Sequence, residues 1–202
     1  TGFYAQILEE NKPNGKVMLA IRGTNETGDW FNANSNYGYN QFSASEADDI
    51  DHQEVMAALR PYIAEGREVI FTGHSLGGGL AQAYSYYTNR MIEENEMDPG
   101  LKRNFRTVTF GAFGGGQLIS MINNNSPPPL IQREDAYGND NAYFSLNQTH
   151  YRYNGDPVSD IGHFPYGQRR TLYYNDSVDA EYQGLQSAEN HMLDRYREWK
   201  RD

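Results

Sequence analysis

Short apolar runs alternate with longer amphipathic stretches along this chain. Residues 16–22 (KVMLAIR) form an apolar run with a glycine on either side, and this pattern predicts a buried strand that leads into a loop. Further strands are expected at residues 68–72, 106–110, 151–153 and 171–174.

Apolar residues at helical spacing predict helices between these strands. The first covers residues 46–64, with Ser45 at its N-cap and Gly66 at its end. The second has one apolar face, formed by Leu76, Leu80, Ala83, Tyr84, Tyr87 and Met91. The last has a face marked by Met192, Tyr196 and Trp199. Strands that alternate with helices predict an α/β domain with a largely parallel sheet.

The chain of 202 residues fits a single domain over residues 1–202. Residues 114–147 contain GGG, NNNSPPP and GNDN, which predict a long irregular excursion rather than a second domain. Because the chain starts at Thr1 without an initiator methionine, we expect it to have been processed or excised from a longer protein.

Composition narrows the classes of function. The net charge of -10 opposes binding to nucleic-acid phosphates. No apolar run approaches the roughly 18 residues of a transmembrane helix, so no transmembrane segment is expected. The absence of cysteine excludes disulfides, a thiolate nucleophile and cysteine-based zinc sites.

The stretch Gly73-His74-Ser75-Leu76-Gly77 has the pattern G-x-S-x-G between a predicted strand and a predicted helix. The pattern alone is weak, but a nucleophile elbow needs this order of strand, sharp turn and helix. The glycines remove side chains that would clash where the strand and the helix meet. A phosphate-binding loop is disfavoured because the lysine of that motif is absent and G-x-G-x-x-G is not matched.

A serine nucleophile needs a base, usually a histidine that a carboxylate orients. The chain has five histidines. His74 is expected to point away across the turn, His52 belongs to the first predicted helix, and His150 precedes a predicted strand. His163 and His191 remain as candidate bases, and both follow the serine in the order Ser, acid, His.

Asp156 is the candidate acid. It follows the predicted strand 151–153, at the sheet edge where catalytic loops are expected. The alternative is an ordinary turn, since N-G-D-P is strong turn chemistry by itself.

Taken together, four segments resemble the class 3 lipases, the fungal-lipase-like branch of the α/β-hydrolases, over about residues 2–200. The segments are VMLAIRGTNETGDWF, VIFTGHSLGGGLA, TVTFGAFGGG, and YRYNGDPVSDI followed by NHMLDRYR. The resemblance implies an α/β-hydrolase fold with a nucleophile elbow. It also implies Ser75 as nucleophile, Asp156 as acid and His191, in preference to His163, as base.

The oxyanion hole is the next element of such a site. Elbow geometry supplies the backbone N–H of Leu76, and the resemblance implies a second donor at Thr24. It also implies a lid or cleft segment near Trp30 and Phe31, which alternatively anchor their loop in the core. The chain departs from the family after TFGA, where three glycines stand in place of the usual Pro and Arg.

The resemblance therefore implies a serine carboxylic-ester hydrolase that cleaves lipid esters through an acyl-enzyme, as a triacylglycerol lipase or a phospholipase A1. The expected partner is a lipid or ester substrate at a membrane or lipid interface, no metal or organic cofactor is required, and the resemblance favours secretion. The alternatives are a small-ester or thioester hydrolase and a catalytically silent hydrolase-like binding module.

Overall fold

The computed structural model describes residues 4–23, 50–94, 97–122, 147–154, 156, 158–160, 162–163 and 167–172. Its main sheet has six strands in the order β1-β2-β3-β4-β6-β8. They are β1 (Ala5–Glu9), β2 (Val17–Ile21), β3 (Val69–His74), β4 (Phe105–Phe110), β6 (Gln148–Tyr153) and β8 (Gln168–Leu172). β1 pairs antiparallel with β2, and the remaining neighbours are parallel, so the predicted largely parallel sheet is confirmed.

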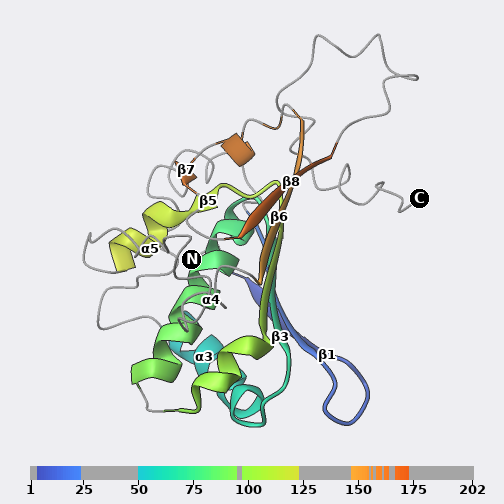
Figure 1. Ribbon diagram of the computed structural model, residues 1–202, viewed down its shortest axis with the longest axis vertical. Coiled ribbons are helices and arrows are strands. Elements are labelled where there is room, and N and C mark those ends of the chain that lie inside the picture. Colours follow the sequence, from blue (N-terminus) through green and yellow to red (C-terminus); the bar gives the residue numbers. More distant parts are fainter. Residues whose placement is uncertain are drawn as a thin grey trace.

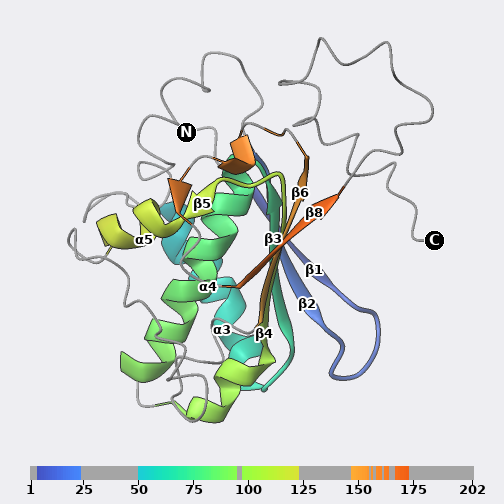
Figure 2. The ribbon, with the colours of Figure 1, turned by 45° about the horizontal axis from the view of Figure 1, so that its top comes forward.

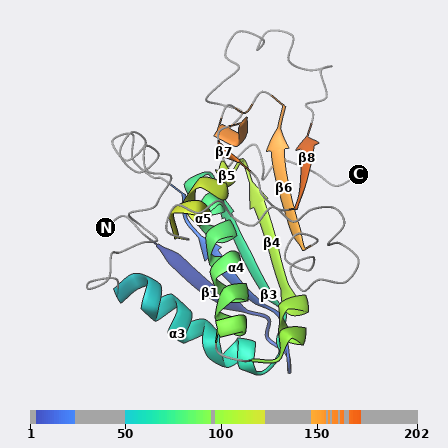
Figure 3. The ribbon, with the colours of Figure 1, turned by 60° about the vertical axis from the view of Figure 1, so that its left-hand side comes forward.

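The helices lie on one face of this sheet, which Figure 1 shows nearly edge-on. They are α3 (Ile50–Ala64), α4 (Leu76–Glu94) and α5 (Gly116–Ile122). The 3-10 turns are η1 (Pro99–Asn104) and η3 (Val158–Asp160). α4 packs along β2, β3 and β4 (Figure 3). A second sheet joins β5 (Gly114–Gly115) and β7 (Gly162–His163) in parallel.

The core lies between the helices and the main sheet. Alternate residues of β2 are buried, and β3 contributes Val69 and Phe71 to the same layer. The ring of Phe71 meets that of Phe105 edge-on, with 6.1 Å between centroids. Burial of each such side chain contributes roughly 1.5–3 kcal/mol, so this layer holds the strands in register beneath α4.

The register brings the carboxyl ends of four parallel strands to one edge of the sheet. Ile21 on β2 pairs with Gly73, His74 on β3 pairs with Phe110, and Phe110 on β4 pairs with Tyr151 on β6. Residues that follow these strands therefore emerge at one edge of the sheet. In open α/β sheets this edge carries the ligand-binding loops.

Most predicted elements are confirmed, with two corrections. The excursion predicted at 114–147 is not irregular throughout, because β5 and α5 form at its start. His150 lies inside β6 rather than before it, since the strand begins at Gln148. β1 was not predicted. The start of the first predicted helix, residues 46–49, and the whole C-terminal one lie outside the described residues.

Candidate active site

Ser75 forms the turn between β3 and α4 by itself. β3 ends at His74 and α4 begins at Leu76. The φ angle of Ser75 is 55°, and Asn14 is the other non-glycine residue with positive φ in the described part of the chain. Left-handed backbone costs a residue with a Cβ atom about 1–2 kcal/mol. The order of strand, sharp turn and helix predicted for this stretch is therefore present, with strain at the serine.

Backbone hydrogen bonds hold Ser75 in this conformation. Its N–H donates to the carbonyl of Phe110 at 3.2 Å. Its carbonyl accepts from the N–H groups of Gly78 at 3.0 Å and Gly79 at 3.2 Å, in the first turn of α4. Strained residues persist where the surrounding structure fixes them in this way. Ser75 is 5% exposed and lies directly before the N-terminus of α4.

The glycines on either side of Ser75 allow the helix to approach the sheet. A Cβ atom on Gly73 would overlap the backbone of Gly77, and one on Gly77 would overlap the carbonyl oxygen of Ile21. These obstacles are backbone atoms, so no side-chain rotation relieves them. The steric role predicted for Gly73 and Gly77 matches this packing.

The chain that leaves β2 passes directly over the elbow. A Cβ atom on Gly23 would lie 2.6 Å from the carbonyl oxygen of His74 and 3.3 Å from the Cβ of Ser75. Gly23 therefore contacts the serine turn, a position that its place directly after a strand could have suggested. Thr24 is the next residue, and Thr24, Trp30 and Phe31 lie outside the described residues.

Asp156 emerges at the same sheet edge, after β6. The N–H of Gly111 donates to the carbonyl of Tyr151 at 2.8 Å, which ties the ends of β4 and β6 together. Asp156 is 1% exposed, and its Oδ1 accepts from the N–H groups of Val158 at 2.9 Å and Ser159 at 3.4 Å. Such hydrogen bonds offset the cost of burying a carboxylate. They are also those of a local turn, so the turn interpretation describes the backbone here equally well.

His150 is buried in the middle of β6. It is 3% exposed, and its Nδ1 lies 2.8 Å from the Oγ1 of Thr109 on β4. The polar side chains of Gln148 and His150 face inward, which explains why hydrophobicity did not reveal this part of the strand. His150 therefore belongs to the sheet interior.

The other histidines occupy different elements. His74 ends β3, His52 lies in the first turn of α3, and His163 lies on β7 beside Gly115 of β5. His191, the base that the family resemblance implies, lies outside the described residues. The structure thus brings Ser75, Leu76 and Asp156 to one sheet edge.

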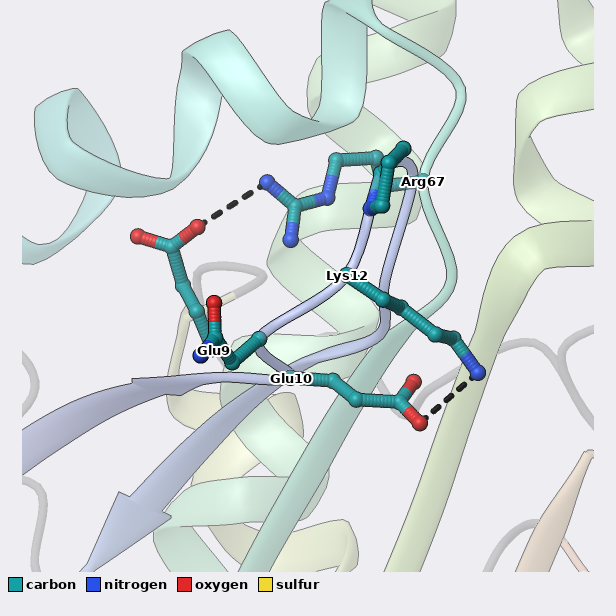
Figure 4. A pocket seen from close by; sticks show the side chains of 6 residues that line it. Glu9, Glu10, Lys12 and Arg67 are labelled. Atoms are coloured by element: carbon teal, nitrogen blue, oxygen red, sulfur yellow. Dashed lines mark hydrogen bonds and ion pairs between the residues drawn. The ribbon is translucent and has the colours of Figure 1, made fainter.

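A cavity of about 520 Å³ lies at the opposite edge of the sheet, beside the β1–β2 hairpin (Figure 4). Arg67 pairs with Glu9 at 3.0 Å and Lys12 with Glu10 at 2.7 Å. The hydroxyl of Tyr62 donates to Glu9 and, with Arg67, lowers the pKa of that carboxyl. The charges here are paired with one another, and the cavity is remote from Ser75.

Among the described residues, no group of three or more His, Asp or Glu side chains is arranged to hold a metal ion. None of the described helices is long and apolar enough to cross a membrane.

A mostly parallel sheet, helices packed along it and a strained serine between strand and helix define an α/β-hydrolase-type domain. The native lipase–propeptide complex of Rhizomucor miehei matches with a TM-score of 0.54 at 15% identity, over 87% of this chain and 54% of that one. This match confirms the predicted fold class.

Residues 1–105 match the Phospholipase-like family model, which is described as a Tle-like phospholipase domain. The chain belongs to this family, in agreement with the predicted lipase resemblance. The extracellular phospholipase A1 of Serratia liquefaciens is 35% identical over 137 residues, which are 67% of this chain and 34% of the relative. The chain thus spans about one third of the length of this curated relative.

Proposed function

We propose that this chain is the catalytic unit of a serine hydrolase that cleaves acyl esters of phospholipids, with phospholipase A1 activity. The observation that carries the proposal is Ser75, which has positive φ and lies between a strand and a helix at the carboxyl edge of the sheet. Membership of the phospholipase-like family and the Serratia phospholipase A1 support the choice of phospholipid over triacylglycerol. The extracellular relative also supports a secreted location.

The proposed mechanism is acyl transfer in two halves. The Oγ of Ser75 attacks the ester carbonyl carbon while a histidine takes the hydroxyl proton. The tetrahedral intermediate collapses as the protonated histidine donates its proton to the leaving oxygen, so the lysophospholipid leaves as an alcohol and the acyl group stays on Ser75. Water, deprotonated by the same histidine, then attacks this acyl-enzyme, and the histidine returns the proton to the Oγ of Ser75 as the fatty acid leaves. No step needs a metal or organic cofactor.

The remaining roles follow the geometry and the family resemblance. The backbone N–H of Leu76 is the first oxyanion donor, because it follows the nucleophile at the start of α4. The contact of Gly23 with Ser75 supports a second donor at Thr24. The buried Asp156 carboxylate orients the histidine and stabilises the imidazolium. His191 is the proposed base, on the resemblance alone.

The test is fatty-acid release from phosphatidylcholine vesicles labelled separately in each acyl chain. We expect release of the sn-1 chain by the wild type and a loss of kcat on the order of a millionfold in Ser75→Ala. Ser85 offers a matched control, since it is a second buried serine on α4 and Ser85→Ala should remain active. Full activity in Ser75→Ala would refute the assignment of Ser75 as the nucleophile.

The same assay separates the alternatives. Hydrolysis of short-chain esters or acyl thioesters but not of vesicles would point to a small-substrate hydrolase. Vesicle binding without hydrolysis of any ester would point to a silent binding module. Loss of activity in His163→Ala but not in His191→Ala would reverse the assignment of the base.

A further inference from the structure

Gln82 is a buried polar side chain on the nucleophile helix. Its amide group makes hydrogen bonds both within this helix and to the segment around β5. It is 1% exposed. Its Nε2 donates to the carbonyls of Gly78 at 3.2 Å and Phe113 at 3.0 Å, and its Oε1 accepts from the N–H of Gly115 at 2.9 Å. Both donor hydrogens of the amide are used. An amide satisfied in this way fixes the two segments that it joins.

Asn89 shows what a purely local amide does on the same helix. It lies seven residues after Gln82, two turns along the same face, and is 7% exposed. Its Nδ2 donates to the carbonyl of Ser85, four residues earlier, at 2.8 Å. Gln82 makes the equivalent bond to Gly78, but it also reaches residues 31 and 33 positions away. The long-range bonds to Phe113 and Gly115 therefore do more than stabilise a helical turn.

Those bonds join the nucleophile helix to β5, and β5 in turn pairs with a strand that follows the candidate acid. β5 (Gly114–Gly115) pairs with β7 (Gly162–His163), which follows Asp156 by a few residues. Figure 2 shows β5 and β7 near the first turns of α4. The path from Ser75 thus runs through two turns of α4 to Gln82, across β5, and through β7 to the chain beside Asp156.

Gly115 also belongs to this connection between α4 and β5, which we call the Gln82 bridge. A Cβ atom on Gly115 would lie 2.8 Å from the Cβ of Gln82, so any larger residue would push β5 away from α4. This contact gives a physical reason for a glycine at this position, where the chain departs from the usual lipase pattern. Gln82 and Gly115 fit together as a pair.

We propose that Gln82 is a positioning residue that sets the spacing between Ser75 and Asp156 through β5 and β7. The inference rests on the proposed function of Ser75 and Asp156. Gln82 itself touches no reacting atom. Its effect should appear in kcat with KM unchanged, because misplaced catalytic groups weaken the transition state without weakening lipid binding.

The test compares Gln82→Met with Asn89→Leu at a temperature well below unfolding of either variant. Both substitutions replace a buried amide on α4 with an apolar side chain of similar length. Only Gln82→Met should lower kcat and the second-order rate of fluorophosphonate labelling, by about 10–100-fold, since small displacements at a reacting centre have effects of this size. Equal rates in the two folded variants would overturn the inference.

Gly115→Ala perturbs the Gln82 bridge from the β5 side. It adds a methyl group against Gln82 and keeps the backbone N–H that donates to Gln82. It should also lower kcat, and its effect combined with Gln82→Met should be smaller than the product of the two separate effects. Independent effects of the two substitutions would overturn the inference. So would an unchanged kcat in folded Gly115→Ala, which can be measured even if Gln82→Met does not fold. A wild type that neither labels nor hydrolyses any ester would instead refute the proposed function.

Discussion

The strain at Ser75 predicts that the nucleophile position is more stable with glycine than with alanine. Ser75→Ala keeps the Cβ atom in the left-handed backbone conformation at φ 55°, whereas Ser75→Gly removes it. Both variants lack the hydroxyl, and they differ by the backbone strain and by one buried methyl group. The same methyl group is lost at the buried Ser85, so comparison of the two positions isolates the conformational term. Neither variant should hydrolyse lipid if Ser75 is the nucleophile.

The size of the effect follows from two opposing contributions. Relief of left-handed strain contributes about 1–2 kcal/mol. The greater freedom of glycine in the unfolded chain costs about 0.5–1 kcal/mol. The net result is a gain of about 0.5–1 kcal/mol for Ser75→Gly over Ser75→Ala. For a domain of this size each kcal/mol corresponds to about 2–4 °C in Tm.

Urea and thermal unfolding of the two variants measure this difference. Ser85 is the matched control, because it is buried in the helical part of α4. At that position Ser85→Gly should be less stable than Ser85→Ala by about 1 kcal/mol. The glycine variant should therefore be the more stable one at position 75, and the alanine variant the more stable one at position 85. A higher stability of Ser75→Ala than of Ser75→Gly would refute the strain at the elbow.

Further predictions concern packing, pH and the candidate acid. Gly77→Ala should lower the free energy of unfolding by about 3 kcal/mol in urea titrations, because the added methyl meets the backbone of Ile21; a change within about 0.5 kcal/mol would contradict that close approach. The hydrogen bond from Tyr62 is the first cause that lowers the pKa of Glu9 in the folded state. The ionised Glu9 therefore contributes to stability above its ordinary pKa of 4.5, and this contribution is lost as the pH falls through the lowered value. Tyr62→Phe should reduce this acid-side loss in unfolding measured against pH, and an identical profile would argue against the pair. Asp156→Asn should slow phospholipid hydrolysis by about 10⁴-fold with the fold retained, and near-wild-type rates would remove Asp156 from the mechanism.

Local chemistry made the elbow predictable from the sequence. The apolar run before Gly73, the glycines at 73 and 77 and the helical spacing after Leu76 are all short-range signals, and each corresponds to a feature of the structure. The position of Asp156 at the sheet edge was predictable for a related reason. A residue that follows a parallel strand emerges at the carboxyl edge, whatever its neighbours are.

Other features depend on contacts between distant segments, and the sequence pattern did not reveal them. β6 starts with Gln148, Thr149 and His150, whose polar character hides a strand that pairs with β4. The glycines before α5 suggested irregular chain, but two of them form β5 by pairing with β7. Nothing in the sequence distinguishes Gln82 from the other polar residues of α4, because its bonds to Phe113 and Gly115 join positions 31 and 33 residues apart.

The most direct test of the central proposal is to locate the covalent adduct of a long-chain alkyl fluorophosphonate on the intact chain by tandem mass spectrometry. We predict a phosphonyl group on Ser75 in the wild type and in Ser85→Ala, and no adduct in Ser75→Ala. An adduct on a different residue, or unchanged labelling of Ser75→Ala, would contradict the role of Ser75 as the nucleophile.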